Sequence, residues 1–154
     1  MADKIKEKSL WSWLKTAKKL YKADLDMHRV ENGVGASFPD VEGYHKKYGP
    51  FVIELKTCPW PKRITTAIRP KFEKGQPEWL YRRWLAGGSA WVLIHIGRES
   101  SSARFLIPGG YAMELNRGVD REFLHLFGIE VSRVEEVFEF IGRIQSRRIK
   151  KFMA

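Results

Sequence analysis

The stretch "FVIELKT", which begins at Phe51, restricts the fold of this chain more than any other segment. Its aromatic, aliphatic and β-branched residues are typical of a buried strand. Side chains alternate between the two faces of a strand, so Ile53 and Leu55 are expected on one face with Phe51. Glu54 and Lys56 then lie together on the opposite face. An acid and an amine inside a buried strand indicate a special role for both.

The segment before this strand supplies a second acid. "FPDVEGY" predicts a strand that begins after Pro39, and "HKKYGP" predicts a polar hairpin turn. Two antiparallel strands joined in this way bring Asp40 close to Glu54 across the ladder. One interpretation is a cross-strand ion pair between Lys56 and either acid. The other is a cation between the two carboxylates, whose repulsion in a partly apolar setting is costly. Oxygen ligands of this kind suit Mg²⁺ or Mn²⁺.

The segments on either side predict helices and further strands. Apolar residues at helical spacing predict an amphipathic helix over residues 9–22, with Ser9 as its N-cap and Leu20 on its apolar face. Gly33 and Gly35 are expected to interrupt regular structure. "CPWPKRITTAIRPKFEKGQP" has four prolines and predicts an extended basic loop, followed by a helix with Pro77 in its first turn.

The remaining segments complete the predicted fold. "SAWVLIHIG" predicts a buried strand, "ARFLIPGGYAMEL" another strand and turn, and "DREFLHLFG" and "SRVEEVFEFIGRIQSRRIKKF" two helices. The order α-β-β-β-α-β favours an α/β fold with a mixed central β-sheet flanked by helices. At 154 residues, one domain is expected over 1–154, with a core at about 9–110 and a C-terminal helical extension at about 118–154.

Composition narrows the class of partner. The chain has 28 Lys and Arg against 18 Asp and Glu, a net charge of +10. Such a surplus favours a polyanion, of which nucleic acid is the commonest, although a merely basic protein has the same charge. Trp60, in the proline-rich loop, is expected either to stack on an unpaired base or to anchor the loop to the core. The loop also holds the residues predicted to contact phosphates, which are Lys62, Arg63, Arg69, Lys71 and Lys74.

Several classes of protein are excluded or disfavoured. Cys58 is the only cysteine, so the chain has neither an internal disulfide nor a cysteine-built zinc site. The four histidines form no HxH or HExxH pattern, which argues against a histidine-zinc enzyme. No apolar segment has the length of a signal peptide core or a membrane helix, and we expect a cytoplasmic protein without a membrane partner.

The motifs together resemble the PD-(D/E)xK nuclease superfamily. That pattern has an acid after proline, E-x-K on the next strand and often a glutamine at the head of the following helix. The sequence is most similar to phage nucleases of the Holliday-junction-resolvase-like type. The resemblance covers roughly residues 10–97 and depends on seven segments in the same order, "LWSWL", "HRVEN", "ASFPDV", "FVIELK", "PWPKR", "QPEWL" and "LAGGSAWVL".

The resemblance implies a restriction-endonuclease-like core and a Mg²⁺- or Mn²⁺-dependent endonuclease acting on DNA, with branched DNA as a candidate substrate. It implies that Asp40 and Glu54 are metal ligands and that Lys56 is the catalytic lysine. Gln76 matches the motif glutamine, or is an ordinary polar residue at a helix start. Relatives use a further early acid, for which we favour Glu31 over Glu7; a solvated loop carboxylate is the alternative. A homodimer is expected, because a junction is cut symmetrically on two strands.

Two other functions remain open from the sequence. The first is a non-catalytic DNA-binding or assembly protein on a nuclease scaffold, although the intact trio of Asp40, Glu54 and Lys56 argues against it. The second is a nuclease that acts on RNA, which only a comparison of substrates can distinguish.

Overall fold

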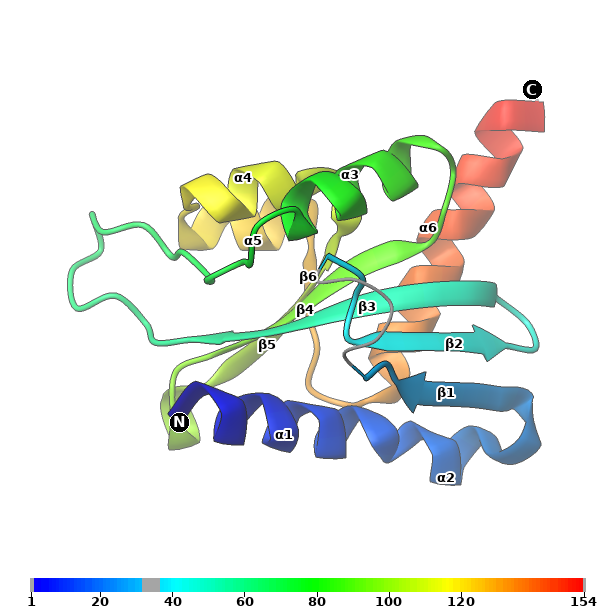
Figure 1. Cartoon of the computed structure of the whole chain (residues 1–154), viewed down its shortest axis with the longest axis horizontal. Coiled ribbons are helices and arrows are strands. Elements are labelled where there is room, and N and C mark those ends of the chain that lie inside the picture. Colours follow the sequence, from blue (N-terminus) through cyan, green and yellow to red (C-terminus); the bar gives the residue numbers. More distant parts are fainter. Residues whose placement is uncertain (1, 32–36, 154) are drawn as a thin grey trace.

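The computed structural model describes residues 2–31 and 37–153, so Gly33 and Gly35 lie outside the described residues. The chain forms α-helices, short 3₁₀ helices and strands (Figure 1). In chain order they are α1 (Ala2–Lys15), α2 (Ala17–Tyr21), η1 (Lys22–Asp24), β1 (Leu25–Arg29), β2 (Val41–His45), β3 (Gly49–Cys58), α3 (Gln76–Leu85), β4 (Ala90–Ile96), η2 (Glu99–Ser101), β5 (Ala103–Pro108), η3 (Gly109–Tyr111), α4 (Ala112–Arg117), α5 (Arg121–Phe127), β6 (Ile129–Glu130) and α6 (Glu135–Met153).

The strands form one mixed sheet in the order β1-β2-β3-β4-β5-β6. Neighbouring strands are antiparallel except β3 and β4, which are parallel. A parallel pair needs a crossover connection, and residues 59–75 with α3 provide it. The predicted order α-β-β-β-α-β and the α/β class with a mixed sheet between helices are therefore confirmed.

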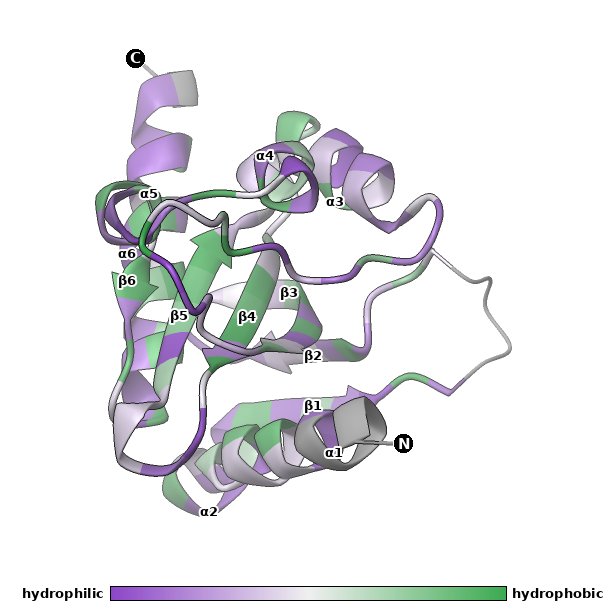
Figure 2. Cartoon of the chain, turned by 90° about the vertical axis from the view of Figure 1, so that its left-hand side faces the viewer, coloured by the Kyte–Doolittle hydropathy of each residue, from purple (hydrophilic) through white to green (hydrophobic). Residues whose placement is uncertain are grey.

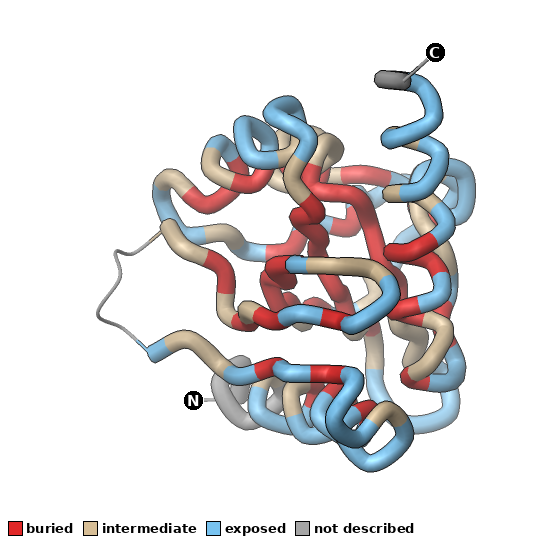
Figure 3. The backbone as a smooth tube through the Cα atoms, turned by 90° about the vertical axis from the view of Figure 1, so that its right-hand side faces the viewer, coloured by how far each residue is buried: buried red, intermediate tan, exposed pale blue. Residues whose placement is uncertain are grey.

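Helices cover both faces of the sheet, and each face has its own apolar cluster. Phe51, Ile53 and Leu55 of β3 pack with α1, α2 and α6 on one face. Val52 and Cys58 pack with α3, α4 and α5 on the other. Figure 2 shows the central strands between these layers, and Figure 3 shows that their backbone is buried while the outer end of α6 is exposed. The predicted alternation of side chains along β3 is confirmed.

The N-terminal helix differs from the prediction. It begins at Ala2 and not at Ser9, because "ADKIKEK" consists mainly of good helix formers. Ser9 is therefore inside the helix and is not its N-cap. A break at Thr16, whose Oγ1 donates to the Trp13 carbonyl at 2.6 Å, separates α1 from α2. Because of this break, the apolar face predicted for one continuous helix over residues 9–22 does not extend into α2. Leu20, which was expected on that face, is 58% exposed.

Three elements after β5 were not predicted, namely η3, α4 and β6. After β5, the segment expected to be a turn continues into η3 and α4. β6 is only two residues long, and its pairing with β5 depends on contacts far apart in the sequence. In the C-terminal part, α6 contributes Val137, Phe138 and Ile141 to the same apolar cluster as α1. No helix in the described residues is both long and apolar enough to cross a membrane.

Candidate active site

The register between β2 and β3 brings the two predicted acids together. Val41 pairs with Ile53 in this antiparallel ladder. Continuing the register by one residue places Asp40, just before β2, opposite Glu54 of β3. Asp40 is held there because its Oδ2 accepts a hydrogen bond from the Leu55 backbone N–H at 2.9 Å. The Val30 N–H in turn donates to the Asp40 carbonyl at 2.7 Å. Asp40 is thus fixed by both neighbouring strands.

The Glu54 carboxyl is buried, and few interactions offset the cost of burying its charge. The residue is 1% exposed, and its Oε2 has no hydrogen-bond partner among the described residues. Burial raises the pKa of the Glu54 carboxyl well above its usual value. A hydrogen bond with Asp40 and the charges of Asp40 and Glu7 raise the pKa further, whereas the charge of Lys56 lowers it. Without a cation beside it, this carboxyl therefore tends to keep a proton.

Lys56 is held by the helix that follows the loop. Its Nζ donates to Gln76 Oε1 at 3.0 Å and lies 4.9 Å from the centre of the Phe72 ring. The ion pairs found among the described residues do not include Lys56, so a salt bridge to Asp40 or Glu54 does not explain its position. The ammonium has three N–H donors, and the bond to Gln76 uses one of them.

Gln76 is positioned by the start of α3. Gly75 has a φ of +89°, a conformation that favours glycine, and it turns the chain into the helix. The Gln76 side chain is buried, and its Oε1 also accepts from the Glu73 N–H at 2.8 Å. These two hydrogen bonds fix the amide oxygen against Lys56. Its burial and its bond to Lys56 favour a supporting role for Gln76 over that of an ordinary polar residue at a helix start, and this role stays a prediction.

The further acids have different surroundings. Glu31 is exposed and immediately precedes the residues that are not described, and its role stays a prediction. Glu42 lies on the same sheet face as Asp40, but it pairs with His28 at 3.3 Å. Glu7 on α1 raises the pKa of Glu54, which places its charge near the site. The helix start predicted at Ser9 leaves Glu7 outside the helix, whereas the helix propensity of "ADKIKEK" extends α1 to include Glu7.

The predicted phosphate contacts all lie in the connection between β3 and α3. Lys62, Arg63, Arg69, Lys71 and Lys74 are exposed, and their binding to nucleic acid stays a prediction. Trp60 anchors this loop, because its Nε1 donates to the Ser101 carbonyl at 2.6 Å and its ring contacts Phe105.

The site suits a divalent cation in its chemistry. Among the described residues, no group of three or more His, Cys, Asp or Glu side chains converges on a metal-binding geometry. Asp40 and Glu54 nevertheless form a close carboxylate pair, and the unpartnered Glu54 Oε2 is a free ligand atom. Mg²⁺ commonly binds through only one or two carboxylates and keeps several waters. The donor set therefore fits Mg²⁺ or Mn²⁺.

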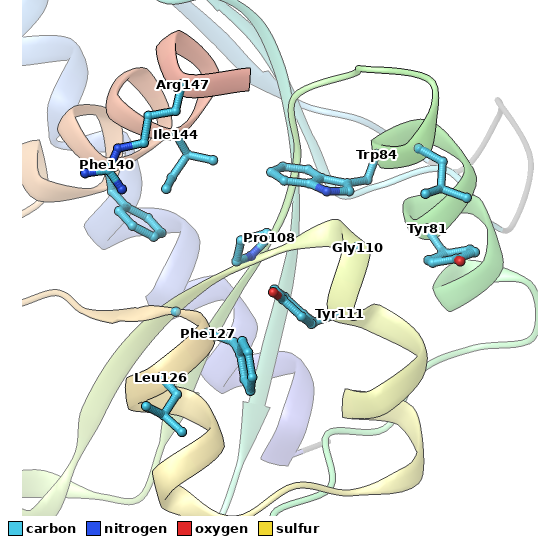
Figure 4. Close-up of a pocket in the computed structure, with 12 residues that line it drawn as sticks. Tyr81, Trp84, Pro108, Gly110, Tyr111, Leu126, Phe127, Phe140, Ile144 and Arg147 are labelled. Carbon is cyan, nitrogen blue, oxygen red and sulfur yellow. The ribbon is translucent and has the colours of Figure 1, made fainter. Parts of the chain in front are cut away.

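A cavity lies apart from the carboxylate site. It has a volume of about 520 Å³ and lies between α3, η3, α5 and α6, where Tyr81, Trp84, Tyr111 and Phe127 line it (Figure 4). Arg147 is the only charged side chain in its lining among the described residues. None of the residues of the carboxylate site lines this cavity, so its size does not mark it as the catalytic centre.

Comparisons with known proteins give similarities to solved structures. No protein-family model matches the chain, and no curated protein matches it. A similar solved structure is Hjc, a Holliday junction resolvase from the archaeal hyperthermophile Archaeoglobus fulgidus. The two chains are 20% identical, the similarity covers 77% of this chain and 93% of the other, and the TM-score is 0.46. A similarity at this level does not transfer residue roles, so these depend on the geometry of this chain itself.

Proposed function

We propose that this protein is a Mg²⁺- or Mn²⁺-dependent endonuclease that hydrolyses phosphodiester bonds in DNA. The observation that carries the proposal is the pair formed by the buried Glu54 and the half-buried Asp40, beside a lysine that is held by Gln76 and not by either acid. A purely structural cluster would pair the lysine with a carboxylate. The order of the motifs in the sequence supports the same conclusion.

Asp40 and Glu54 are the proposed metal ligands. When bound, Mg²⁺ or Mn²⁺ supplies positive charge at the scissile phosphate and lowers the pKa of a water molecule. A cation held by the two carboxylates would favour the ionised form of Glu54 and would satisfy its Oε2. Glu7 is the better supported third acid, because its charge acts on Glu54.

Lys56 is proposed to act on the scissile phosphate and the attacking water, and Gln76 is proposed to position Lys56. The two N–H donors of Lys56 that Gln76 does not use can orient the attacking water and offset the negative charge that develops on the phosphate. Gln76 positions the ammonium through its amide oxygen. By the resemblance to known nucleases, we expect 5′-phosphate and 3′-hydroxyl products.

DNA is the proposed substrate, with branched DNA as the candidate form and a homodimer as the candidate assembly. The net charge of +10 and the exposed basic residues between β3 and α3 support a polyanionic partner. Symmetric cutting of two strands needs two copies of the site. A non-catalytic DNA-binding or assembly role explains the charge equally well, but it does not explain a buried acid whose Oε2 has no hydrogen-bond partner among the described residues.

The test is cleavage of supercoiled, linear and four-way-junction DNA with Mg²⁺ or Mn²⁺. Wild type is expected to cut, whereas Glu54→Gln and Lys56→Ala each lose at least about two orders of magnitude in rate. Glu42→Gln is the matched control, since Glu42 lies on the same face but outside the pair. If wild type cuts and both site variants cut equally well, the site assignment is wrong. Salt-sensitive binding that ignores divalent metal, without any cleavage, favours the binding protein instead.

A further inference from the structure

The connection between β3 and α3, residues 59–75, forms an arm that extends outward beyond the ends of the other strands (Figure 1). In Figure 2 it runs across the front of the molecule toward the start of α3. It contains five basic residues and a single acid, Glu73. The proposed chemistry uses only the end of the arm nearest Gln76, and the only role predicted for its tip is contact of Lys62 and Arg63 with phosphates.

The base of the arm is fixed at two places. On the first side, Trp60 bonds to the Ser101 carbonyl, and the Arg121 guanidinium lies 4.0 Å from the centre of its ring. On the return side, Ile68 and Val119 exchange two backbone hydrogen bonds, Ile68 N–H to Val119 O at 2.7 Å and Val119 N–H to Ile68 O at 2.9 Å. The tip, residues 61–67, is therefore mounted between two anchors on the body of the protein.

The tip presents one apolar side chain among basic ones. Ile64 is fully exposed, at 103% of its reference area, and the exposed Lys62 and Arg63 precede it directly. The Thr66 N–H donates to the Arg63 carbonyl at 3.1 Å and closes the turn at this point. Keeping an isoleucine in water forgoes its burial, so a partner that covers it would strengthen binding.

A cavity of about 430 Å³ lies between the tip and the first turn of α5. Trp60, Ile64 and Arg121 contribute to its walls, together with Asp120 and Glu122. The Asp120 carboxylate already caps α5 by accepting from the Phe123 N–H at 2.8 Å. The cavity thus combines an aromatic face, an apolar tip and a guanidinium, which are groups that contact bases and phosphates.

We propose that Ile64 is a wedge that enters an opened base step of branched DNA, while Lys62 and Arg63 bind the flanking phosphates. This inference rests on the proposed function and specifies branched DNA as the substrate class. Apolar wedges of this kind unstack a base step, and the cost is lowest where stacking is already interrupted, as at a branch point. Trp60, the other candidate for stacking, is committed to holding the arm.

The arm and the candidate site can contact the same DNA. The return half of the arm ends at Gly75, and the next residue, Gln76, bonds to Lys56. A branch point at the tip therefore directs an adjoining strand toward the carboxylate pair. A lone isoleucine is a poor membrane anchor, which makes DNA the better occupant than an anionic lipid surface.

The test uses a four-way junction with 2-aminopurine at the branch point and Ca²⁺ in place of Mg²⁺. At saturating protein, wild type is expected to raise the fluorescence by unstacking the base, and Ile64→Ser is expected to lose most of that rise. Ile149→Ser is the matched control, because Ile149 is an isoleucine that is 58% exposed on α6. With Mg²⁺, the ratio of junction cleavage to linear-duplex cleavage should fall about tenfold for Ile64→Ser alone.

The outcomes separate this proposal from the proposed function. Cleavage of junctions that Ile64→Ser leaves unchanged, with an unchanged fluorescence rise, overturns the wedge and keeps the nuclease. An Ile64-dependent rise without any cleavage keeps the wedge and overturns the hydrolase. Failure to bind the junction overturns the wedge and leaves the nuclease to be judged by cleavage of supercoiled and linear DNA. Flotation with anionic vesicles that depends on Ile64, without fluorescence change on DNA, shows that the arm binds lipid and overturns the wedge.

Discussion

At the scale of single residues, Glu54 is the side chain that makes the site favourable for a cation. Its carboxyl is buried, faces Asp40 and has an oxygen without a partner among the described residues. Such a group destabilises the folded protein once it is ionised, unless a cation accompanies it. The arrangement is therefore unfavourable for the metal-free fold at neutral pH and favourable for metal binding.

Glu54→Gln should stabilise the metal-free protein at high pH. The folded-state pKa of Glu54 lies above the ordinary value of 4.5, so its contribution to stability is present at low pH and is lost as pH rises through the folded-state pKa. The glutamine removes this loss, and we expect a gain of about 1–3 kcal/mol in the free energy of unfolding at pH 8 in EDTA. Thermal and urea unfolding at pH 5 and pH 8 measure it.

Glu42→Gln is the control for that experiment, because the Glu42 side chain is 42% exposed on the neighbouring strand. Its effect should stay within about 0.5 kcal/mol at both pH values. A Glu54→Gln protein that is no more stable than wild type at pH 8, with the same dependence on pH, would show that the carboxyl is not strained by burial.

Gln76→Ala should lower kcat about 10- to 100-fold and change KM little, because the alanine leaves Lys56 without the oxygen that positions it. Single-turnover cleavage over a range of DNA concentrations separates the two constants. Glu73→Ala is the control, since only the backbone of Glu73 bonds to Gln76. A rise in KM at constant kcat would mean that Gln76 helps to bind DNA and does not position the lysine.

At the scale of elements, α6 is attached to the rest of the fold by Arg148. This arginine lies in the basic C-terminal half of α6. In the structure its guanidinium donates to the Gly88 carbonyl at 3.0 Å and to the Trp84 carbonyl, and it lies 3.7 Å from the centre of the Trp84 ring. It therefore ties α6 to the end of α3.

Arg148→Ala should destabilise the protein by about 1–3 kcal/mol, because two carbonyls lose a charged donor and the Trp84 ring loses its cation. The adjacent Arg147→Ala removes the same charge from an exposed position and should change stability by less than about 0.5 kcal/mol. Chemical denaturation of the two variants gives the comparison. Equal effects would show that Arg148 acts only through its charge.

At the scale of the whole molecule, the sequence predicted what depends on local pattern. The alternation along β3, the hairpin before it and the start of α3 at Gln76 follow from neighbouring residues, and together they bring Asp40, Glu54, Lys56 and Gln76 to one place. These features are readable because strand period, turn residues and helix starts are encoded within a few positions.

Features that depend on distant contacts were not predictable from the sequence. Trp60 could stack on a base or anchor a loop, and its bond to Ser101, 41 residues away, decided this. β6 exists through its pairing with β5. Glu7 was set aside because the first helix was predicted to begin too late, and its charge acts on Glu54 only through the packing of α1 against β3.

The most direct test of the whole account is calorimetric titration of the protein with Mn²⁺ in two buffers of different ionisation enthalpy at pH 7. The account predicts saturable uptake accompanied by release of protons, because burial raises the pKa of the Glu54 carboxyl and a cation beside it would lower that pKa again. Glu42→Gln should behave like wild type, and Glu54→Gln should lose most of the affinity. Absence of Mn²⁺ uptake by wild type, even with a DNA oligonucleotide present, would contradict the proposal that Asp40 and Glu54 hold a catalytic cation.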